Sequence, residues 1–130
     1  MSADRLRVLC VDDNHDVADS EVMLLDVYGF DARACYDGPH ALVEARAFRP
    51  DVYLVDLNMP GMDGCEVARE VRAGHDGPPP LLVAITAKSG TEDYRRTAEA
   101  GFDAHLIKPV EPSRLLAMLS GFKPTASAPA

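Results

Sequence analysis

Apolar residues along the chain fall into two alternating patterns. Short, nearly continuous apolar runs alternate with stretches in which apolar side chains recur every three or four positions. The first pattern is typical of strands buried on both faces of a sheet, and the second of helices that pack on it. The runs predict five strands, at residues 6–11, 30–35, 52–55, 81–85 and 102–107. The second of these is the most polar, which favours a place near the edge of the sheet.

Capping and turn residues predict a helix after each strand. Asn14 is an expected N-cap, Pro39 suits a first helical turn, and the Asp63–Glu66 spacing matches a capping box. Ser89 and Glu92 repeat that spacing. Together with the glycine and proline stops, these signals place the helices at about 15–28, from Gly38 to Pro50, from Asp63 to Gly74, from Ser89 to Gly101, and from Pro112 onward.

Five strands alternating with five helices predict a doubly wound α/β fold, with a parallel sheet covered by helices on both faces. The length of 130 residues suits one domain, which we place at residues 1–122. The last segment, 123–130, has few bulky apolar residues and is expected to be a disordered tail.

Composition and charge exclude several classes of function. A formal net charge of −8 argues against nucleic acid as a partner, because such binding depends on Lys and Arg at phosphates. No apolar run is long enough for a membrane span, and the first residues lack the apolar region of a signal peptide. Three cysteines without metal-ligand spacing are expected to be buried free thiols. These features favour a cytoplasmic protein.

Polar residues that carry chemistry follow four of the predicted strands. They are Asp12 and Asp13, Asp56, Thr86 and Lys108. Because the carboxyl ends of parallel strands meet at one edge of a sheet, we expect these side chains to converge. Crowded carboxylates need a cation, and an oxygen-only ligand set suits Mg²⁺. Lys108 and Thr86 suit a phosphoryl oxygen, and Asp56 could attack phosphorus to form an acyl phosphate.

Four motifs span nearly the whole chain in one order. They are Val-Asp-Asp at 11–13, Asp-Leu-Asn-Met-Pro-Gly-Met-Asp-Gly at 56–64, Ile-Thr-Ala at 85–87 and Ile-Lys-Pro at 107–109. By these motifs the chain resembles a response-regulator receiver domain of two-component signalling. The resemblance implies a flavodoxin-like fold with strand order 2-1-3-4-5. It also implies that Asp56 accepts a phosphoryl group from a sensor histidine kinase or a histidine phosphotransfer protein.

The resemblance also assigns a metal site. It implies that Asp13, Asp56 and the main-chain carbonyl of Asn58 hold Mg²⁺, with Asp12 acting largely through water. Mn²⁺ is the expected alternative ion.

The same resemblance assigns the residues around the phosphoryl group. Asp12, Lys108 and Thr86 would assist the chemistry at Asp56. Thr86 would also act as the switch hydroxyl, and the bond before Pro109 would be cis.

One position departs from the family pattern. The switch position on the fifth strand is often Tyr or Phe in such domains, and here it is His105. A smaller, titratable ring predicts a looser or pH-sensitive switch. The alternative is that His105 is a half-exposed strand residue without a switching role.

Several functions remain open to sequence reasoning. The first is a receiver that signals by shifting between two conformations, without being an enzyme for any reaction beyond its own phosphorylation and dephosphorylation. The chain would be a single-domain response regulator that contacts a downstream protein through roughly residues 90–120. An alternative is an intermediate receiver of a phosphorelay or a hybrid kinase. A Mg²⁺-dependent phosphohydrolase is disfavoured, because Asn58 stands where such enzymes carry a second acid.

Overall fold

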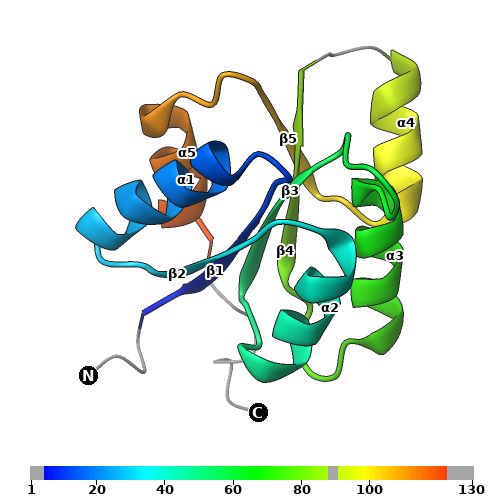
Figure 1. The fold of residues 1–130 in the computed structure, drawn as a ribbon, viewed down its shortest axis with the longest axis horizontal. Helices are drawn as coiled ribbons and strands as arrows, with labels where there is room; N and C mark the ends of the chain where they lie inside the picture. The colour runs from blue at the N-terminus through cyan, green and yellow to red at the C-terminus, as the bar shows by residue number, and fades with distance from the viewer. Residues whose placement is uncertain (1–4, 88–90, 123–130) are drawn as a thin grey trace.

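The computed structural model describes residues 5–87 and 91–122. Its elements alternate as predicted (Figure 1). The strands are β1 (Arg7–Val11), β2 (Asp31–Cys35), β3 (Val52–Asp56), β4 (Leu81–Thr86) and β5 (Ala104–Ile107). The helices are α1 (His15–Val27), α2 (Gly38–Ala47), α3 (Gly64–Gly74), α4 (Thr91–Ala100) and α5 (Pro112–Ser120).

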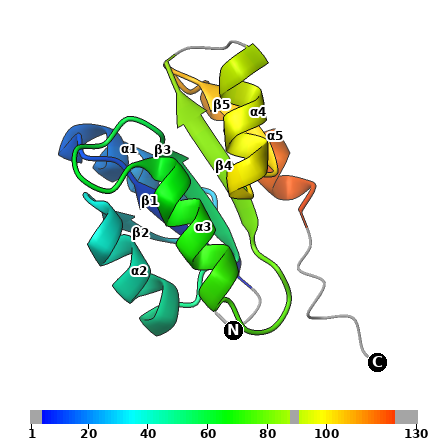
Figure 2. The same ribbon diagram turned by 90° about the vertical axis from the view of Figure 1, so that its right-hand side faces the viewer.

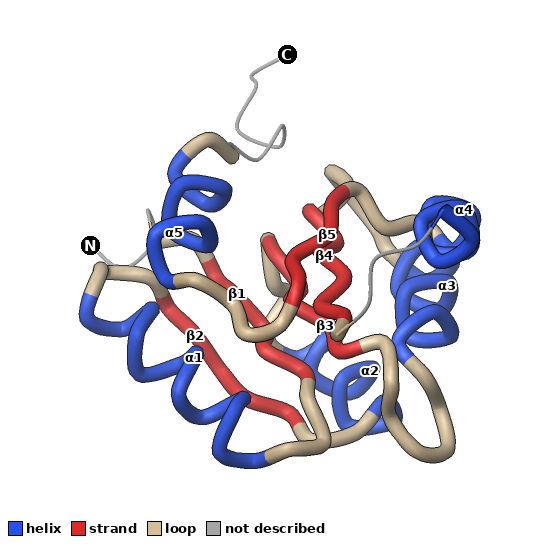
Figure 3. Tube along the Cα trace, turned by 90° about the horizontal axis from the view of Figure 1, so that it is seen from above, coloured by secondary structure: helices blue, strands red, loops and turns tan. Residues whose placement is uncertain are grey.

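The five strands form one parallel sheet in the order β2-β1-β3-β4-β5, which confirms the expected fold. Helices α1 and α5 lie on one face, and α2, α3 and α4 lie on the other (Figures 2 and 3). All residues of the central strand β3 are buried, whereas the edge strand β2 is largely half-buried. The greater polarity of residues 30–35 did therefore indicate the edge.

Side chains of the central strands alternate between two cores, one on each face of the sheet. Leu9 and Tyr53 belong to the core under α2, α3 and α4. Cys10 and Leu54 belong to the core under α1 and α5. The three cysteines are buried and free, as the sequence predicted. In the described ranges, no helix has the length and apolar character needed to cross a bilayer.

The predicted helix starts are confirmed at two caps. The Asn14 side chain accepts a hydrogen bond from the Val17 N–H at 3.3 Å. Asp63 and Glu66 exchange the two bonds of a capping box, at 2.9 and 3.1 Å. The match at Ser89 and the tail 123–130 lie outside the described residues.

The fifth strand is shorter than predicted, because it begins at Ala104 and not at residue 102. Gly101 has a φ of +110°, and the Phe102 N–H donates to the Thr97 carbonyl at 3.0 Å, so the chain turns here to close α4. The Asp103 carboxylate accepts a bond from the Leu82 N–H and pairs with Arg72. These contacts hold residues 102 and 103 in the turn, and the strand begins only after them.

Candidate functional site

The carboxyl edge of the sheet brings together the polar residues that follow its strands. Asp12 directly follows β1, Asp56 and Thr86 end β3 and β4, and Lys108 directly follows β5. Asp12, Asp56 and Thr86 are almost fully buried, and Lys108 is half-buried. Asp13 is exposed at the rim. The predicted convergence of the site residues is therefore present.

Three carboxylates form the centre of this site. Oxygen atoms of Asp12, Asp13 and Asp56 all lie within 4.8 Å of one another. The Lys108 Nζ atom is 3.2 Å from an oxygen of Asp12 and 3.4 Å from an oxygen of Asp56. One ammonium group thus faces three acids, so negative charge remains in excess.

The environment changes the proton affinities of two of these groups. Burial, and then the negative charge of Asp12, raise the pKa of Asp56, although the Asn58 N–H and Lys108 oppose the rise. Burial alone would lower the pKa of Lys108, but its contacts with Asp12 and Asp56 together raise it. Lys108 therefore stays charged, and Asp56 lies in a site that favours additional positive charge.

Main-chain groups orient the buried carboxylates. The Asn14 N–H donates to Asp12 at 2.9 Å, and the Asn58 N–H donates to Asp56 at 3.3 Å. The Lys108 N–H donates to the Thr86 carbonyl at 2.8 Å, which joins the two strand ends. The Lys108–Pro109 peptide bond is cis. The site is thus built on rigid strand ends and not on free loops.

The donor set fits a hard divalent cation. Three carboxylates converge, two of them are buried, and the Asn58 N–H of the loop that follows β3 donates to Asp56. Oxygen ligands of this kind, with one exposed side for water, suit Mg²⁺. The excess of negative charge gives a physical reason for a cation here.

His105 lies on β5 and faces α4. Its Nε2 atom contacts the Thr97 hydroxyl oxygen, and its ring meets Tyr94 edge-on, with centroids 4.4 Å apart. The Thr97 hydroxyl donates to the Tyr94 carbonyl at 3.0 Å, so its oxygen is left to accept the imidazole N–H. His105 is half-buried and held by α4.

Sequence reasoning missed one acid near this site, Glu21. It lies on the inner side of α1, is 9% exposed, and shares a hydrogen bond with the Cys10 thiol. Burial, and then the charge of Asp12, raise its pKa to about 7. Together with Lys108, Glu21 lines a hollow of about 550 Å³. Its position on α1, three residues after Ala18 and four before Leu25, places it on the buried apolar stripe of the helix and was the available signal.

Gly64 packs against the strand end that carries Asp56. A Cβ atom here would lie 2.6 Å from the Asp56 carbonyl oxygen and 2.9 Å from the Leu57 Cα. Both neighbours are backbone atoms, which cannot rotate away. The start of α3 is therefore held in direct contact with the site.

A Gly64→Ala variant is expected to lose about 2 kcal/mol of unfolding free energy, because overpacking must displace backbone. Gly74→Ala, at the other end of α3, is the matched control, since its Cβ would meet nothing within 4 Å. Urea unfolding of both variants measures the difference. Equal stability of the two would contradict the close contact.

Comparisons with known proteins agree with this geometry. The family model described as response regulator receiver domain matches residues 8–120. The chain is 39% identical over 117 residues to the DNA-binding response regulator MtrA of Mycobacterium bovis, covering 90% of this chain and 50% of that protein. It is 40% identical over 111 residues to the transcriptional regulatory protein PrrA of Mycobacterium leprae, covering 85% and 47%. The chain thus spans about half the length of the curated relatives it matches.

A solved structure gives the same result for the fold. The chemotaxis response regulator CheY4 of Vibrio cholerae superimposes with a TM-score of 0.83 and 29% identity, over 89% of this chain and 97% of that one. Proteins of this kind accept phosphoryl groups, and response regulators partner with histidine kinases. The chain belongs to the response regulator receiver domain family, the phospho-accepting module of two-component signalling.

Proposed function

We propose that Asp56 is the phospho-acceptor of this receiver. The observation that carries the proposal is the Asp56 carboxylate at a strand end, beside two further acids and 3.4 Å from the Lys108 ammonium. Its donor is a phosphohistidine on a sensor kinase or a phosphotransfer protein. The chain then catalyses only its own phosphorylation and dephosphorylation.

In this mechanism a carboxylate oxygen of Asp56 attacks the phosphorus atom of the phosphohistidine. A P–O bond forms, the P–N bond breaks, and the imidazole nitrogen takes the electron pair. Lys108, which now bridges Asp12 and Asp56, moves to an oxygen of the transferred group and offsets its charge. We expect the Thr86 hydroxyl to contact another oxygen; its support is that Thr86 lies one residue beyond the β4 partner of Asp56.

We assign the cation site to Asp13, Asp56 and the Asn58 carbonyl, with Asp12 acting through water. A bound Mg²⁺ ion, or Mn²⁺ in its place, would offset charge on the transferring group. The excess of carboxylates over ammonium groups supports this assignment.

We assign the switch to Thr86 and His105. Movement of the Thr86 hydroxyl toward the phosphoryl group would open space behind it for the His105 ring. To take that space, the His105 ring must break its contact with the Thr97 hydroxyl of α4. The change would reach a downstream protein through α4, β5 and α5.

The net charge of −8 supports a protein, and not nucleic acid, as the partner of this chain. The receiver domain itself would span residues 1–122 and act in the cytoplasm.

The switch is expected to depend on pH through His105. More of the imidazole is charged at pH 6 than at pH 8, and a charged ring resists burial. Amide chemical-shift changes of β5 and α4 on adding beryllofluoride and Mg²⁺ should therefore be smaller at pH 6. His105→Tyr is the control, and its response should change less between the two pH values than that of the natural sequence. If the shift changes of the two proteins depend on pH in the same way, the imidazole has no switching role.

Incubation with acetyl phosphate and Mg²⁺, followed by intact-mass measurement, tests the proposed function. We expect one added phosphoryl group, located on Asp56 by peptide mapping and absent after EDTA treatment. Addition of Mn²⁺ to the EDTA-treated protein should restore it. If no adduct accumulates, beryllofluoride binding separates rapid hydrolysis from a silent acceptor: failure to bind would overturn the proposal.

A further inference from the structure

A carboxylate lies buried under α1, on the wall of the hollow beside Lys108. It belongs to Glu21, which is 9% exposed and which the proposed phosphoryl transfer does not use. The other polar residues of α1 and its N-cap that line the hollow are Asn14, Asp16 and Ser20. An aliphatic side chain would fill this position without the cost of burying a polar group. Packing therefore gives no reason for an acid here.

The Glu21 carboxylate has weak local support. Its hydrogen-bond donor is the Cys10 thiol, and burial raises the pKa of that thiol, so the sulfur keeps its proton. In the ranges 5–87 and 91–122, no lysine or arginine nitrogen lies within 4.0 Å of the carboxylate. A thiol is a weak donor, so most of the cost of burying a charge remains.

The charges of the phosphoryl site act on Glu21 from neighbouring strands. Burial contributes most to its raised pKa of about 7, and the negative charges of Asp12 and Asp56 add to the rise. The ammonium of Lys108 and the Cys10 thiol oppose it. Across the hollow, one ammonium thus stands against several acids. The Glu21 carboxyl is mostly protonated at pH 6 and mostly ionised at pH 8.

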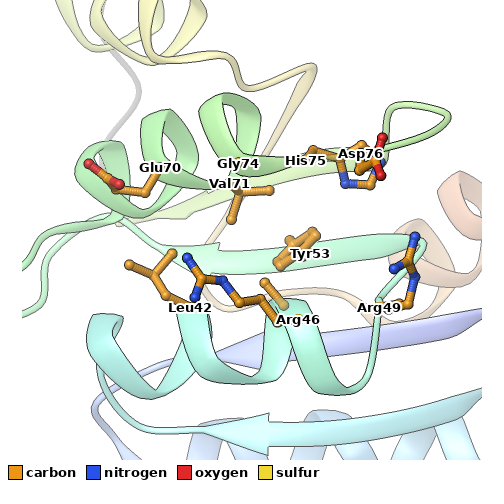
Figure 4. A pocket seen from close by; sticks show the side chains of 10 residues that line it. Leu42, Arg46, Arg49, Tyr53, Glu70, Val71, Gly74, His75 and Asp76 are labelled. Carbon is orange, nitrogen blue, oxygen red and sulfur yellow. The ribbon is translucent and has the colours of Figure 1, made fainter.

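The hollow between α2 and α3 has no such imbalance. Arg46 and Arg49 stand on its α2 side, and Glu70 and Asp76 stand on the opposite side (Figure 4). The charges there offset one another. The excess of acid therefore belongs to the phosphoryl edge of the sheet, where a proton on Glu21 changes the total.

We propose that Glu21 controls how tightly the phosphoryl site holds its divalent cation. An ionised Glu21 adds one negative charge near Asp12 and Asp56 and strengthens the attraction for the ion. Binding of the ion favours the ionised form in turn, so Glu21 gives up its proton to solvent when the ion binds. Glu21 acts through space and is not a ligand. The inference rests on the cation site of the proposed function but does not require phosphoryl transfer.

Calorimetric titrations of the full chain with Mg²⁺ at pH 6 and pH 8 test this role. A coupling of about fivefold, at the low end for linked sites, predicts that the Kd of the natural sequence falls about threefold more between these pH values than that of Glu21→Gln. Protons on the ligand carboxylates compete with the ion in both proteins, so the comparison isolates Glu21. Glu99→Gln makes the same chemical change at an exposed position on α4 and should behave like the natural sequence.

Carbon-13 spectra of the side-chain carboxyl groups give a second readout, which a purely structural role would not move. The Glu21 signal, assigned by its loss in Glu21→Gln, should titrate near pH 7 without Mg²⁺. With saturating Mg²⁺ it should titrate about 0.7 pH unit lower, because a fivefold coupling acts equally on both equilibria.

Two results would overturn this role and leave the cation site in place. They are Mg²⁺ binding with the same pH dependence in Glu21→Gln and the natural sequence, and a Glu21 signal that titrates at the same pH with and without Mg²⁺. If the natural sequence binds no Mg²⁺ at either pH, the cation site is wrong and the role of Glu21 falls with it. Acetyl phosphate labelling reports separately on Asp56.

Discussion

An Asp56→Asn variant is expected to take up no phosphoryl group from acetyl phosphate. The amide is a poor nucleophile, and it removes one of the three carboxylates that attract a cation. Intact mass after incubation with Mg²⁺ measures the loss. Asp26→Asn makes the same chemical change at an exposed position near the end of α1 and should be labelled like the natural sequence.

This variant should also remain folded. Burial and the charge of Asp12 disfavour the ionised form of Asp56, so a neutral side chain relieves both effects. We therefore expect a melting temperature in EDTA no lower than that of the natural sequence. A phosphoryl adduct of undiminished yield on Asp56→Asn would show that another residue is the acceptor.

A Glu21→Gln variant is expected to be more stable than the natural sequence above neutral pH. The ordinary pKa of this carboxyl is 4.5, and the fold raises it to about 7, chiefly through burial. Folding therefore favours the protonated form. The natural protein should lose stability as pH rises from 4.5 through 7, whereas the glutamine variant has no such loss.

The expected difference in unfolding free energy is near zero at pH 4.5. It reaches about 3 kcal/mol at pH 8, since each pKa unit corresponds to about 1.4 kcal/mol. Urea unfolding in EDTA across this pH range measures it. Glu99→Gln, an exposed glutamate on α4, is the control. If the unfolding free energies of the Glu21→Gln variant and the natural protein change with pH in the same way, the fold does not favour the neutral form of the Glu21 carboxyl.

The sequence predicted the arrangement of this site because parallel strands place their ends together. Asp12, Asp56 and Lys108 each follow an apolar run, so their convergence required only the fold. The bridging position of Lys108 between two carboxylates was not predictable, because side-chain rotamers depend on distances between elements.

Other contacts escaped prediction for related reasons. Glu21 lies on a helical stripe, but a charged residue there gives no sign of how deeply it is buried. Thr97 contacts His105 from a different element, at a separation that periodicity cannot reveal. The late start of β5 depends on the bonds of Asp103 to Arg72 and Leu82, which are tertiary contacts. Local patterns predict elements well and their mutual contacts poorly.

The central place of β3 has a consequence for motion. Its neighbours β1 and β4 pair with it along its length, and all its residues are buried. Amide hydrogens of such a strand exchange with solvent only when the whole sheet opens. Asp56 therefore lies at the end of a strand whose amide hydrogens should exchange slowly, while the chain from Asn58 to Gly61 is largely exposed. Under the proposed function, a phosphoryl group on Asp56 would displace the surrounding loops and helices more than the strand that carries it.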